Sequence, residues 1–319
     1  MIRIFSYSRE SNRMETPGIV ELPRHLDDRG RMIWVDLEDP TDEEVGVLGG
    51  IFGFHILAAE DCIHGNHLPK VDVYDETLFL MLHAVDTEIL QERFETVEVG
   101  IFIGDHYLVT HHKKHVKGIF DSRGQVAKTP GSLLRSPDWL LHSILDSMVD
   151  NYMPAVEDLE GRMEDLEIVL LNTPGQGDIQ KALHLHQEAF HLERVGRLQQ
   201  EILRQMSTGK LPWFSEENRV YFRDIYDHLV RVTQSGERLK DRVSGALSVY
   251  QALAANRTDR AVRVLAVCGV TLMPLLWLAG IHFGTLLWFN DPRIFYSVLG
   301  AMVVAGGLTL GIFKKKGWF

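Results

Sequence analysis

Histidine and carboxylate side chains are the metal-binding groups of this sequence, and His282 stands out because it lies in a long uncharged stretch. Imidazole is a borderline-soft ligand that suits Zn²⁺, Ni²⁺ or Co²⁺, whereas Mg²⁺ prefers oxygen ligands. Phe283, Gly284 and Thr285 follow His282, so the threonine hydroxyl is the next polar side chain. The alternative for His282 is a structural histidine that is hydrogen-bonded to a neighbouring backbone group.

The other histidines include two local clusters. His111, His112 and His115 make one cluster, and His64 and His67 make the other. Either cluster has groups that bind transition metals, but surface histidines at a strand end or in a loop are the commoner explanation of such a pattern. We therefore expect these histidines to lie at the surface.

No motif of an enzyme active site is present. The sequence contains no P-loop, no Gly-x-Ser-x-Gly and no Cys-x-x-Cys. Its glycine-rich stretch at Gly175–Asp178 is interpreted as a turn between helices. We expect neither enzymatic activity nor a tightly bound cofactor.

Charge and cysteine content narrow the class of protein further. The formal net charge of −11 argues against nucleic acid as a partner and fits a domain that attracts cations. Cys62 and Cys268 are the two cysteines, too few for a disulfide framework, so we expect a reducing cytoplasmic setting for the part outside the membrane.

Two apolar segments near the C-terminus are long enough to cross a bilayer. The first runs from Val264 to Phe289 without a formally charged residue, and the second runs from Ile294 to Phe313. A helix needs ~20 such residues. We predict a membrane region over 262–319, with transmembrane helices at about 264–284 and 294–313 joined by a short external loop. The alternative is a buried helical hairpin.

Basic residues flank both predicted spans on one side. Arg257, Arg260 and Arg263 precede the first span, and Lys314–Lys316 follow the second. The positive-inside rule then places both termini in the cytoplasm. We expect a multi-pass protein of the inner (plasma) membrane, with membrane lipids as partners.

Residues 1–135 are predicted to form an α+β domain. The runs RMIWVDL, VDVYDETLFLMLHAV and VEVGIFIGDHYLVTHH alternate apolar and polar residues and are rich in β-branched and aromatic types, which indicates strands. Between them, Thr41 and Glu44 have the spacing of a capping box, so a short helix is expected there.

From 136 to 261 the pattern is helical. Breaks occur at Asn172–Gly175 and near Ser207–Gly209, and a third helix is expected from about Ser215 with no proline until Pro274. Its apolar residues recur at spacings of three, four and seven, which is typical of a stalk that packs against other helices, in one chain or in an oligomer.

Several blocks of the sequence carry a family resemblance. They are YFRDIYDHLVRV (Tyr221–Val232), RLKDRVSGALSVYQALAANRTDRAVRVLAV (Arg238–Val267), MPLLWLAGI (Met273–Ile281), FKKKGWF (Phe313–Phe319), LPKVDVYDETLFLMLHAV and LLHSILDSMVDNYMPAVEDLEGRMEDLE. In order and spacing these blocks resemble the CorA/ZntB-type family of two-transmembrane divalent metal-ion transporters, over nearly the whole chain.

The resemblance implies a CorA-like homopentameric funnel in which the first transmembrane helices line a central pore. The residues that fall on one face of that helix are Thr258, Val262, Leu265, Gly269 and Met273. Thr258 and Asp259 would offer oxygens at the cytoplasmic end, and the apolar residues would form a gate that closes by dewetting. The alternative is that this face packs against the second helix.

The family's Gly-Met-Asn motif at the pore mouth has no counterpart here. In a gapless alignment Phe283, Gly284 and Thr285 take its place, and His282 replaces the tyrosine before it. An asparagine ring suits hydrated Mg²⁺, and threonine hydroxyls are a poorer substitute. The transported cation therefore stays open among Mg²⁺, Zn²⁺, Co²⁺ and Ni²⁺.

The resemblance also implies a regulatory metal site between subunits. Asp224 matches one of its acidic positions, and Glu88 or Asp86 of a neighbouring copy would supply the partner. The alternative for Asp224 is a solvated charge on an amphipathic helix.

Taken together, these features predict channel-like transport of divalent metal cations across the membrane. Two alternatives are open: a zinc–proton cotransporter, and a membrane-anchored metal sensor or scaffold that does not conduct.

Overall fold

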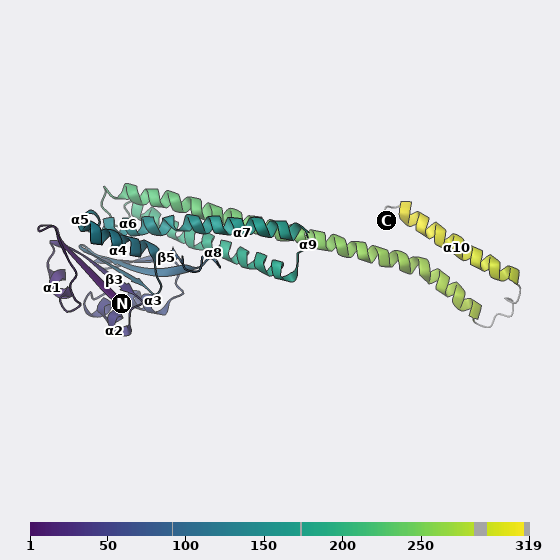
Figure 1. Cartoon of the computed structure of the whole chain (residues 1–319), viewed down its shortest axis with the longest axis horizontal. Helices are drawn as coiled ribbons and strands as arrows, with labels where there is room; N and C mark the ends of the chain where they lie inside the picture. Colours follow the sequence, from purple (N-terminus) through teal and green to yellow (C-terminus); the bar gives the residue numbers. More distant parts are fainter. Residues whose placement is uncertain (91, 173, 284–291, 316–319) are drawn as a thin grey trace. The chain divides into compact units, whose positions relative to one another are not determined.

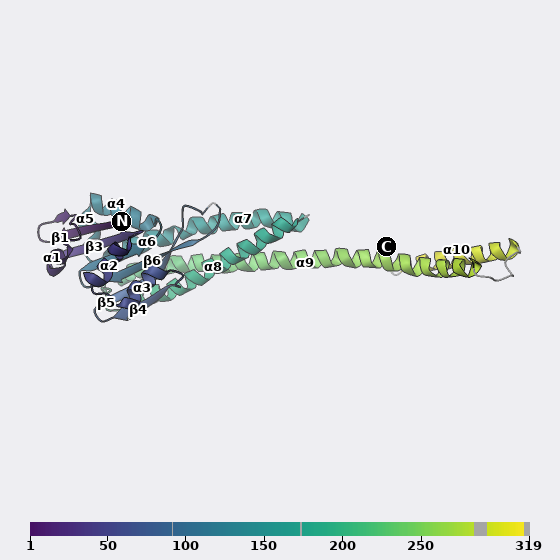
Figure 2. The same ribbon diagram turned by 90° about the horizontal axis from the view of Figure 1, so that it is seen from below.

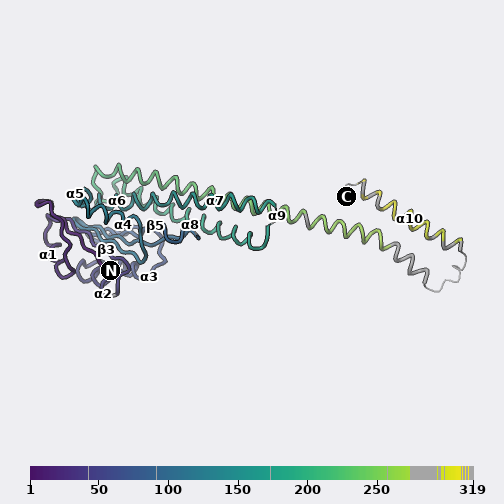
Figure 3. Tube along the Cα trace, in the orientation of Figure 1, coloured from purple at the N-terminus to yellow at the C-terminus, as the bar shows by residue number. Residues whose placement is uncertain are grey.

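The computed structural model describes residues 1–90, 92–172, 174–283 and 292–315. The chain divides into two compact units, Met1–Ala246 and Leu247–Phe319, and each is described by itself. The Cα trace in Figure 3 follows the first unit from its purple strands to its teal and green helices.

The first unit is built on a seven-stranded sheet in the order β2-β1-β3-β7-β6-β5-β4. The strands are β1 (Ile2–Ser8), β2 (Arg13–Glu15), β3 (Arg31–Glu38), β4 (Lys70–Tyr74), β5 (Thr77–Val85), β6 (Thr96–Ile103) and β7 (Tyr107–His112). Every neighbouring pair is antiparallel except β3 and β7, which run parallel from Ile33↔Tyr107 to Glu38↔His112. The strands predicted from alternation are thus confirmed, and the parallel pairing at the centre joins segments far apart in the sequence.

Helices cover both faces of this sheet, as Figures 1 and 2 show. On one face lie α1 (Leu22–Asp27), α2 (Asp42–Gly50) and α3 (Ile56–His64), and on the other lie α4 (Lys117–Lys128), α5 (Pro130–Leu133) and α6 (Pro137–Asp150). Ile33 and Val35 point to the first face, where they share a buried core with Leu48 and Ala58. The sheet is therefore enclosed, which explains why its strands are apolar on both faces.

The predicted capping box is present at the start of α2. The Thr41 hydroxyl accepts a hydrogen bond from the Glu44 backbone N–H at 3.3 Å, and a Glu44 carboxylate oxygen accepts one from the Thr41 N–H at 3.0 Å. Such a cap stabilises a helix by about 1 kcal/mol.

Three long helices follow: α7 (Tyr152–Asn172), α8 (Gln176–Ser207) and α9 (Arg219–Phe283). Helices α8 and α9 approach closely at two glycines. A Cβ atom on Gly196 would lie 2.4 Å from the Thr233 hydroxyl oxygen, and one on Gly236 would lie 3.2 Å from the Glu193 backbone nitrogen. The predicted packing of the stalk helix is therefore present within a single chain.

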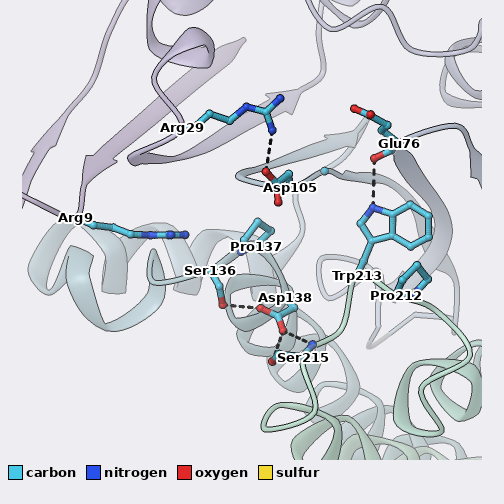
Figure 4. Close-up of a pocket in the computed structure, with 11 residues that line it drawn as sticks. Arg9, Arg29, Glu76, Asp105, Ser136, Pro137, Asp138, Pro212, Trp213 and Ser215 are labelled. Carbon is cyan, nitrogen blue, oxygen red and sulfur yellow. Dashed lines mark hydrogen bonds and ion pairs between the residues drawn. The ribbon is translucent and has the colours of Figure 1, made fainter.

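Helix α9 begins four residues later than the sequence pattern indicates. The carboxylate of Asp138 at the start of α6 accepts hydrogen bonds from the Ser215 N–H at 3.0 Å, the Ser215 hydroxyl at 2.8 Å and the Asn218 side-chain amide at 2.9 Å. Figure 4 shows this carboxylate held between Ser136 and Ser215. These bonds keep Ser215–Asn218 in a turn, which moves the helix start to Arg219.

The second unit contains the later part of α9 and α10 (Pro292–Lys315). Within the residues that the structure describes, no helix combines the length and the apolar composition needed to span a membrane. The predicted spans 264–284 and 294–313 include positions whose side chains lie outside this description. Those spans stay a prediction.

Candidate functional site

The candidate pore residues lie on α9 in the second unit. Three apolar members are exposed, Val262 by 57%, Leu265 by 71% and Met273 by 75%, whereas Val267 on another face is 3% exposed. Gly269 has no atom within 4 Å of the place where a Cβ would stand. This face of the helix is therefore apolar and open in the single chain, and Val264, Val270 and Leu272 on adjoining faces are exposed as well.

Oxygen atoms are available at one end of this face. Thr258 and Asp259 are both exposed on α9. The Thr258 hydroxyl donates to the Ala254 carbonyl at 3.1 Å, and its oxygen has the lone pairs of an acceptor. A hydroxyl and a carboxylate offer the hard oxygen ligands that a hydrated divalent cation requires.

The candidate pore mouth is only partly within the described chain. His282 and Phe283 belong to the last turn of α9, but their side chains are not described. Gly284 and Thr285 lie outside the described residues. The roles assigned to these four residues stay predictions.

The candidate regulatory carboxylates have unequal surroundings. Asp86 is 2% exposed and its carboxylate pairs with the Lys114 ammonium at 2.8 Å. Glu88 is exposed, and its backbone N–H donates to Asp86 at 3.2 Å. Asp224 is exposed on α9. Of the two predicted partners for Asp224, Glu88 is the one whose carboxylate is open to a second chain.

The structure adds two carboxylates that sequence reasoning missed. Asp146 and Asp150 of α6 face the start of α9, and burial, then the charges of Asp150 and Asp224, raise the pKa of Asp146. His228 of α9 lies 3.7 Å from the Asp150 carboxylate. This acidic surface of α6 and α9 repels itself when ionised, so a divalent cation would relieve the repulsion.

A sequence signal for this acidic surface exists. His142, Asp146 and Asp150 are spaced by four residues, as are Asp224 and His228, so each set forms a polar stripe along one helix. What the sequence does not reveal is that α6 and α9 bring the two stripes together. Within the described chain, no group of three or more His, Cys, Asp and Glu side chains is arranged to hold a metal ion.

The expectation of surface histidines is wrong for His111 and His112. Both lie in β7 and are buried, with 3% and 1% exposure. His112 contacts the Lys114 carbonyl at 2.6 Å through Nδ1 and the Asp36 carboxylate at 3.1 Å through Nε2. Burial lowers the pKa of His111 to about 4. These imidazoles are parts of the sheet core.

An open pocket lies beside the turn that precedes α9 (Figure 4). Several of its polar groups have partners: the Arg29 guanidinium pairs with Asp105 at 2.8 Å, and the Trp213 indole N–H donates to the Glu76 carbonyl at 3.3 Å. Asp138 on its floor is held by the bonds that fix the start of α9. The pocket is therefore explained by the packing of that turn.

Comparison with known proteins identifies the family. Residues 29–315 match the family described as CorA-like Mg²⁺ transporter protein. The chain is 29% identical to a putative metal ion transporter, YfjQ, of Bacillus subtilis, over 90% of this chain and 89% of that one. It is 26% identical to the cobalt/magnesium transport protein CorA of Thermotoga maritima, over 99% of this chain and 92% of that one. The complete structure of the CorA magnesium transporter from Methanocaldococcus jannaschii superposes with a TM-score of 0.79 at 20% identity, covering 100% of this chain and 99% of that one, so the fold is shared.

Proposed function

This chain belongs to the CorA-like Mg²⁺ transporter family, and we propose that it carries divalent metal cations across a membrane through a channel-like pore. The observation that carries the proposal is the open apolar face of α9, with Leu265 and Met273 exposed by 71% and 75% and with oxygen ligands at one end. A static apolar face of this kind suits a gate better than a binding site, because it offers a cation no ligand.

The proposed assembly is a homopentamer of the inner membrane, with two transmembrane helices per copy and both termini in the cytoplasm. The exposed apolar side chains of α9 and α10 support it, since Leu265, Met273 and Val303 each expose at least 70% of their surface in the single chain. Other copies of α9 would cover one face, and lipid would cover the rest.

In the proposed mechanism a cation passes the pore mouth at His282–Thr285, crosses the apolar constriction and reaches the oxygens of Thr258 and Asp259. Val262, Leu265 and Met273 would close the constriction by excluding water. The membrane potential drives inward movement by roughly 5 kcal/mol for a doubly charged ion at 100 mV.

Regulation would use the acidic surface of α6 and α9. A divalent cation bound at Asp224, with Asp146 beside it and the exposed Glu88 from a neighbouring copy, would hold adjacent copies together. Burial and then the charges of Asp150 and Asp224 raise the pKa of Asp146, and the charge part supports this assignment because a bound cation would offset that repulsion.

Metal flux into liposomes that hold the purified protein tests the proposal. The assay compares Mg²⁺, Zn²⁺, Co²⁺ and Ni²⁺, each with and without an inward proton gradient. Flux that follows the membrane potential alone is the expected result. Flux that requires the proton gradient would indicate a cotransporter, and a folded, pentameric protein without flux would indicate a sensor or scaffold. A monomer or dimer in mild detergent would contradict the pentamer.

A further inference from the structure

A chain of three polar side chains joins the sheet to helix α8. His83 of β5 is 5% exposed, and its Nε2 lies 2.8 Å from the His67 carbonyl oxygen. Its Nδ1 lies 2.8 Å from the Thr96 hydroxyl oxygen on β6. The same hydroxyl lies 2.9 Å from Nε2 of His191 on α8. The Thr96 hydroxyl therefore bridges two imidazole rings on different elements.

Only one arrangement of protons satisfies all three contacts with both rings neutral. The His67 carbonyl accepts only, so Nε2 of His83 carries the proton and its Nδ1 must accept. The Thr96 hydroxyl then donates to His83, and Nε2 of His191 donates to Thr96. The chain has a fixed direction, and it needs the unprotonated Nδ1 of His83.

The bonds beside this chain do not titrate near neutral pH. The Gln199 side chain of α8 accepts from the His83 backbone N–H at 2.8 Å and donates to the Tyr152 hydroxyl of α7 at 3.1 Å. Tyr152 donates to the His83 carbonyl at 2.8 Å, and burial raises the pKa of this phenol. The two histidines are thus the groups by which acid can alter this contact.

The opposite side of the same α8 segment holds α9. Gln200 donates to the Leu229 carbonyl at 3.2 Å, and Glu193 pairs with Lys240 at 2.5 Å. Gly196 lies against Thr233 with no room for a Cβ. A change in how α8 meets the sheet therefore reaches α9, the helix that also carries the candidate pore residues.

We propose that His83, Thr96 and His191 form an acid-released latch that ties α8, and through it α9, to the sheet. Protonation of His83 at Nδ1 turns the acceptor of the chain into a donor, so the Thr96 hydroxyl proton loses its acceptor. Protonation of His191 places a second positive charge near the first, since the ring centroids are 6.5 Å apart.

Burial sets the direction in which the pKa values of the two latch histidines shift, and the groups around them add to it or oppose it. Around His83, burial lowers the pKa of the imidazole, while the His67 carbonyl and Glu98 on β6 raise it by less. Around His191, burial, then His83 and Arg194, lower the pKa, and Glu95 opposes them. Both folded-state pKa values lie below the unfolded value of ~6.5. The latch is therefore intact above that pH and is lost as the pH falls through the folded-state values.

Hydrogen exchange of the full-length protein in detergent, at pH 7.5 and 5.5 and corrected for the intrinsic rate, tests the latch. We expect amides of β5 and of α8 from 191 to 200 to lose protection about tenfold at the lower pH. Thr96→Val should remove much of that protection at pH 7.5. His191→Gln keeps an N–H donor but does not titrate, so its acid loss should be clearly smaller than that of the wild type.

His184→Asn is the matched control, because His184 is exposed on the same helix. It should lose protection in acid as the wild type does. Equal wild-type protection at both pH values would overturn the latch even where Thr96→Val fails to fold, and so would a folded Thr96→Val protein whose acid loss equals that of the wild type. The acid response of metal flux is a second readout. It rests on the proposed function, whereas the hydrogen-exchange test does not. Absent wild-type flux would contradict that function, whereas flux whose acid response is identical in wild type and Thr96→Val would contradict the latch's control of it.

Discussion

Leu80 of β5 has no exposed surface, whereas Leu265 of α9 exposes 71% of its own. Polar groups of the first unit can also find their partners inside the chain: the Asp36 carboxylate accepts from Thr110 at 2.7 Å and from Arg123 at 2.9 Å. The Met1–Ala246 unit thus packs its core and pairs most of its buried polar groups within one chain, whereas the Leu247–Phe319 unit leaves large apolar side chains exposed in the single chain. Substitutions should therefore affect stability in the first unit and transport in the second.

A leucine-to-serine change in each unit tests this contrast most directly. Leu80→Ser should destabilise the full-length protein by about 3–5 kcal/mol, because it leaves a cavity and a hydroxyl inside the sheet. Thermal unfolding followed by circular dichroism in detergent measures the effect. Leu265→Ser is the matched control and should leave the unfolding of the first unit unchanged. Equal destabilisation by both changes would mean that Leu265 is also part of a core.

The partly buried ion pairs of Glu38 at the end of β3 should make the first unit sensitive to acid. Burial raises the pKa of Glu38, but bonds from the Arg123 and Arg3 guanidinium groups outweigh it and lower that pKa from 4.5 to about 2. A lowered carboxylate pKa stabilises the fold above the unfolded value of 4.5, and this stability is lost as the pH falls toward 2. Glu38→Gln should therefore cost about 2 kcal/mol at pH 7 and progressively less below pH 4.5. Exposed Glu10, changed to glutamine, should show no such pH-dependent difference in denaturant midpoint.

The close contact of α8 and α9 predicts a smaller effect inside the first unit. Gly196→Ala would place a Cβ 2.4 Å from the Thr233 hydroxyl oxygen, so the helices must separate at a cost of about 1–3 kcal/mol. Gly161→Ala on α7 is the control, because no atom lies within 4 Å of its Cβ position, and it should stabilise the helix by about 0.5–1 kcal/mol. Melting temperatures that move in the same direction for both variants would refute the contact.

In the second unit the same reasoning predicts a change in flux without a change in stability. Leu265→Ser and Met273→Ser should admit water to the constriction and raise metal flux, on the order of tenfold. Liposome flux at matched protein content measures this. Val267→Ser, at a position that is 3% exposed, is the comparison variant and should not raise it. Unchanged flux in both Leu265 and Met273 variants would mean that this face packs against a neighbouring helix.

Patterns among neighbouring residues predicted the positions of strands and helix ends that depend on short-range interactions. The run RMIWVDL predicted β3, and the capping box of Thr41 and Glu44 predicted the start of α2. The break before Gly175 predicted the boundary between α7 and α8. Long-range contacts decided the rest. His112 is buried because Asp36 accepts from it across the parallel β3–β7 pair, 76 residues away, and α9 starts late because Asp138 holds Ser215. The acidic surface could not be predicted, because it forms only where α6 packs on α9, and the sequence of either helix does not show that contact.

The histidines give the last comparison, between imidazoles that the sheet encloses and one at the proposed pore mouth. His111 and His112 are buried and bonded within the first unit, so they cannot select the transported metal. His282 is the nearest imidazole to the missing Gly-Met-Asn position, and a neutral ring binds Zn²⁺ or Co²⁺ better than Mg²⁺. His282→Ala should therefore reduce Zn²⁺ and Co²⁺ flux a few-fold and Mg²⁺ flux less, with exposed His184→Ala as the control.

A protonated ring repels cations, so wild-type Zn²⁺ flux should fall as the external pH drops through roughly 6.5, and this pH response should vanish in His282→Ala. Faster uptake from an acidic exterior would instead indicate proton coupling. Identical fluxes and pH profiles in wild type and His282→Ala would make His282 a structural residue and place selectivity elsewhere along α9.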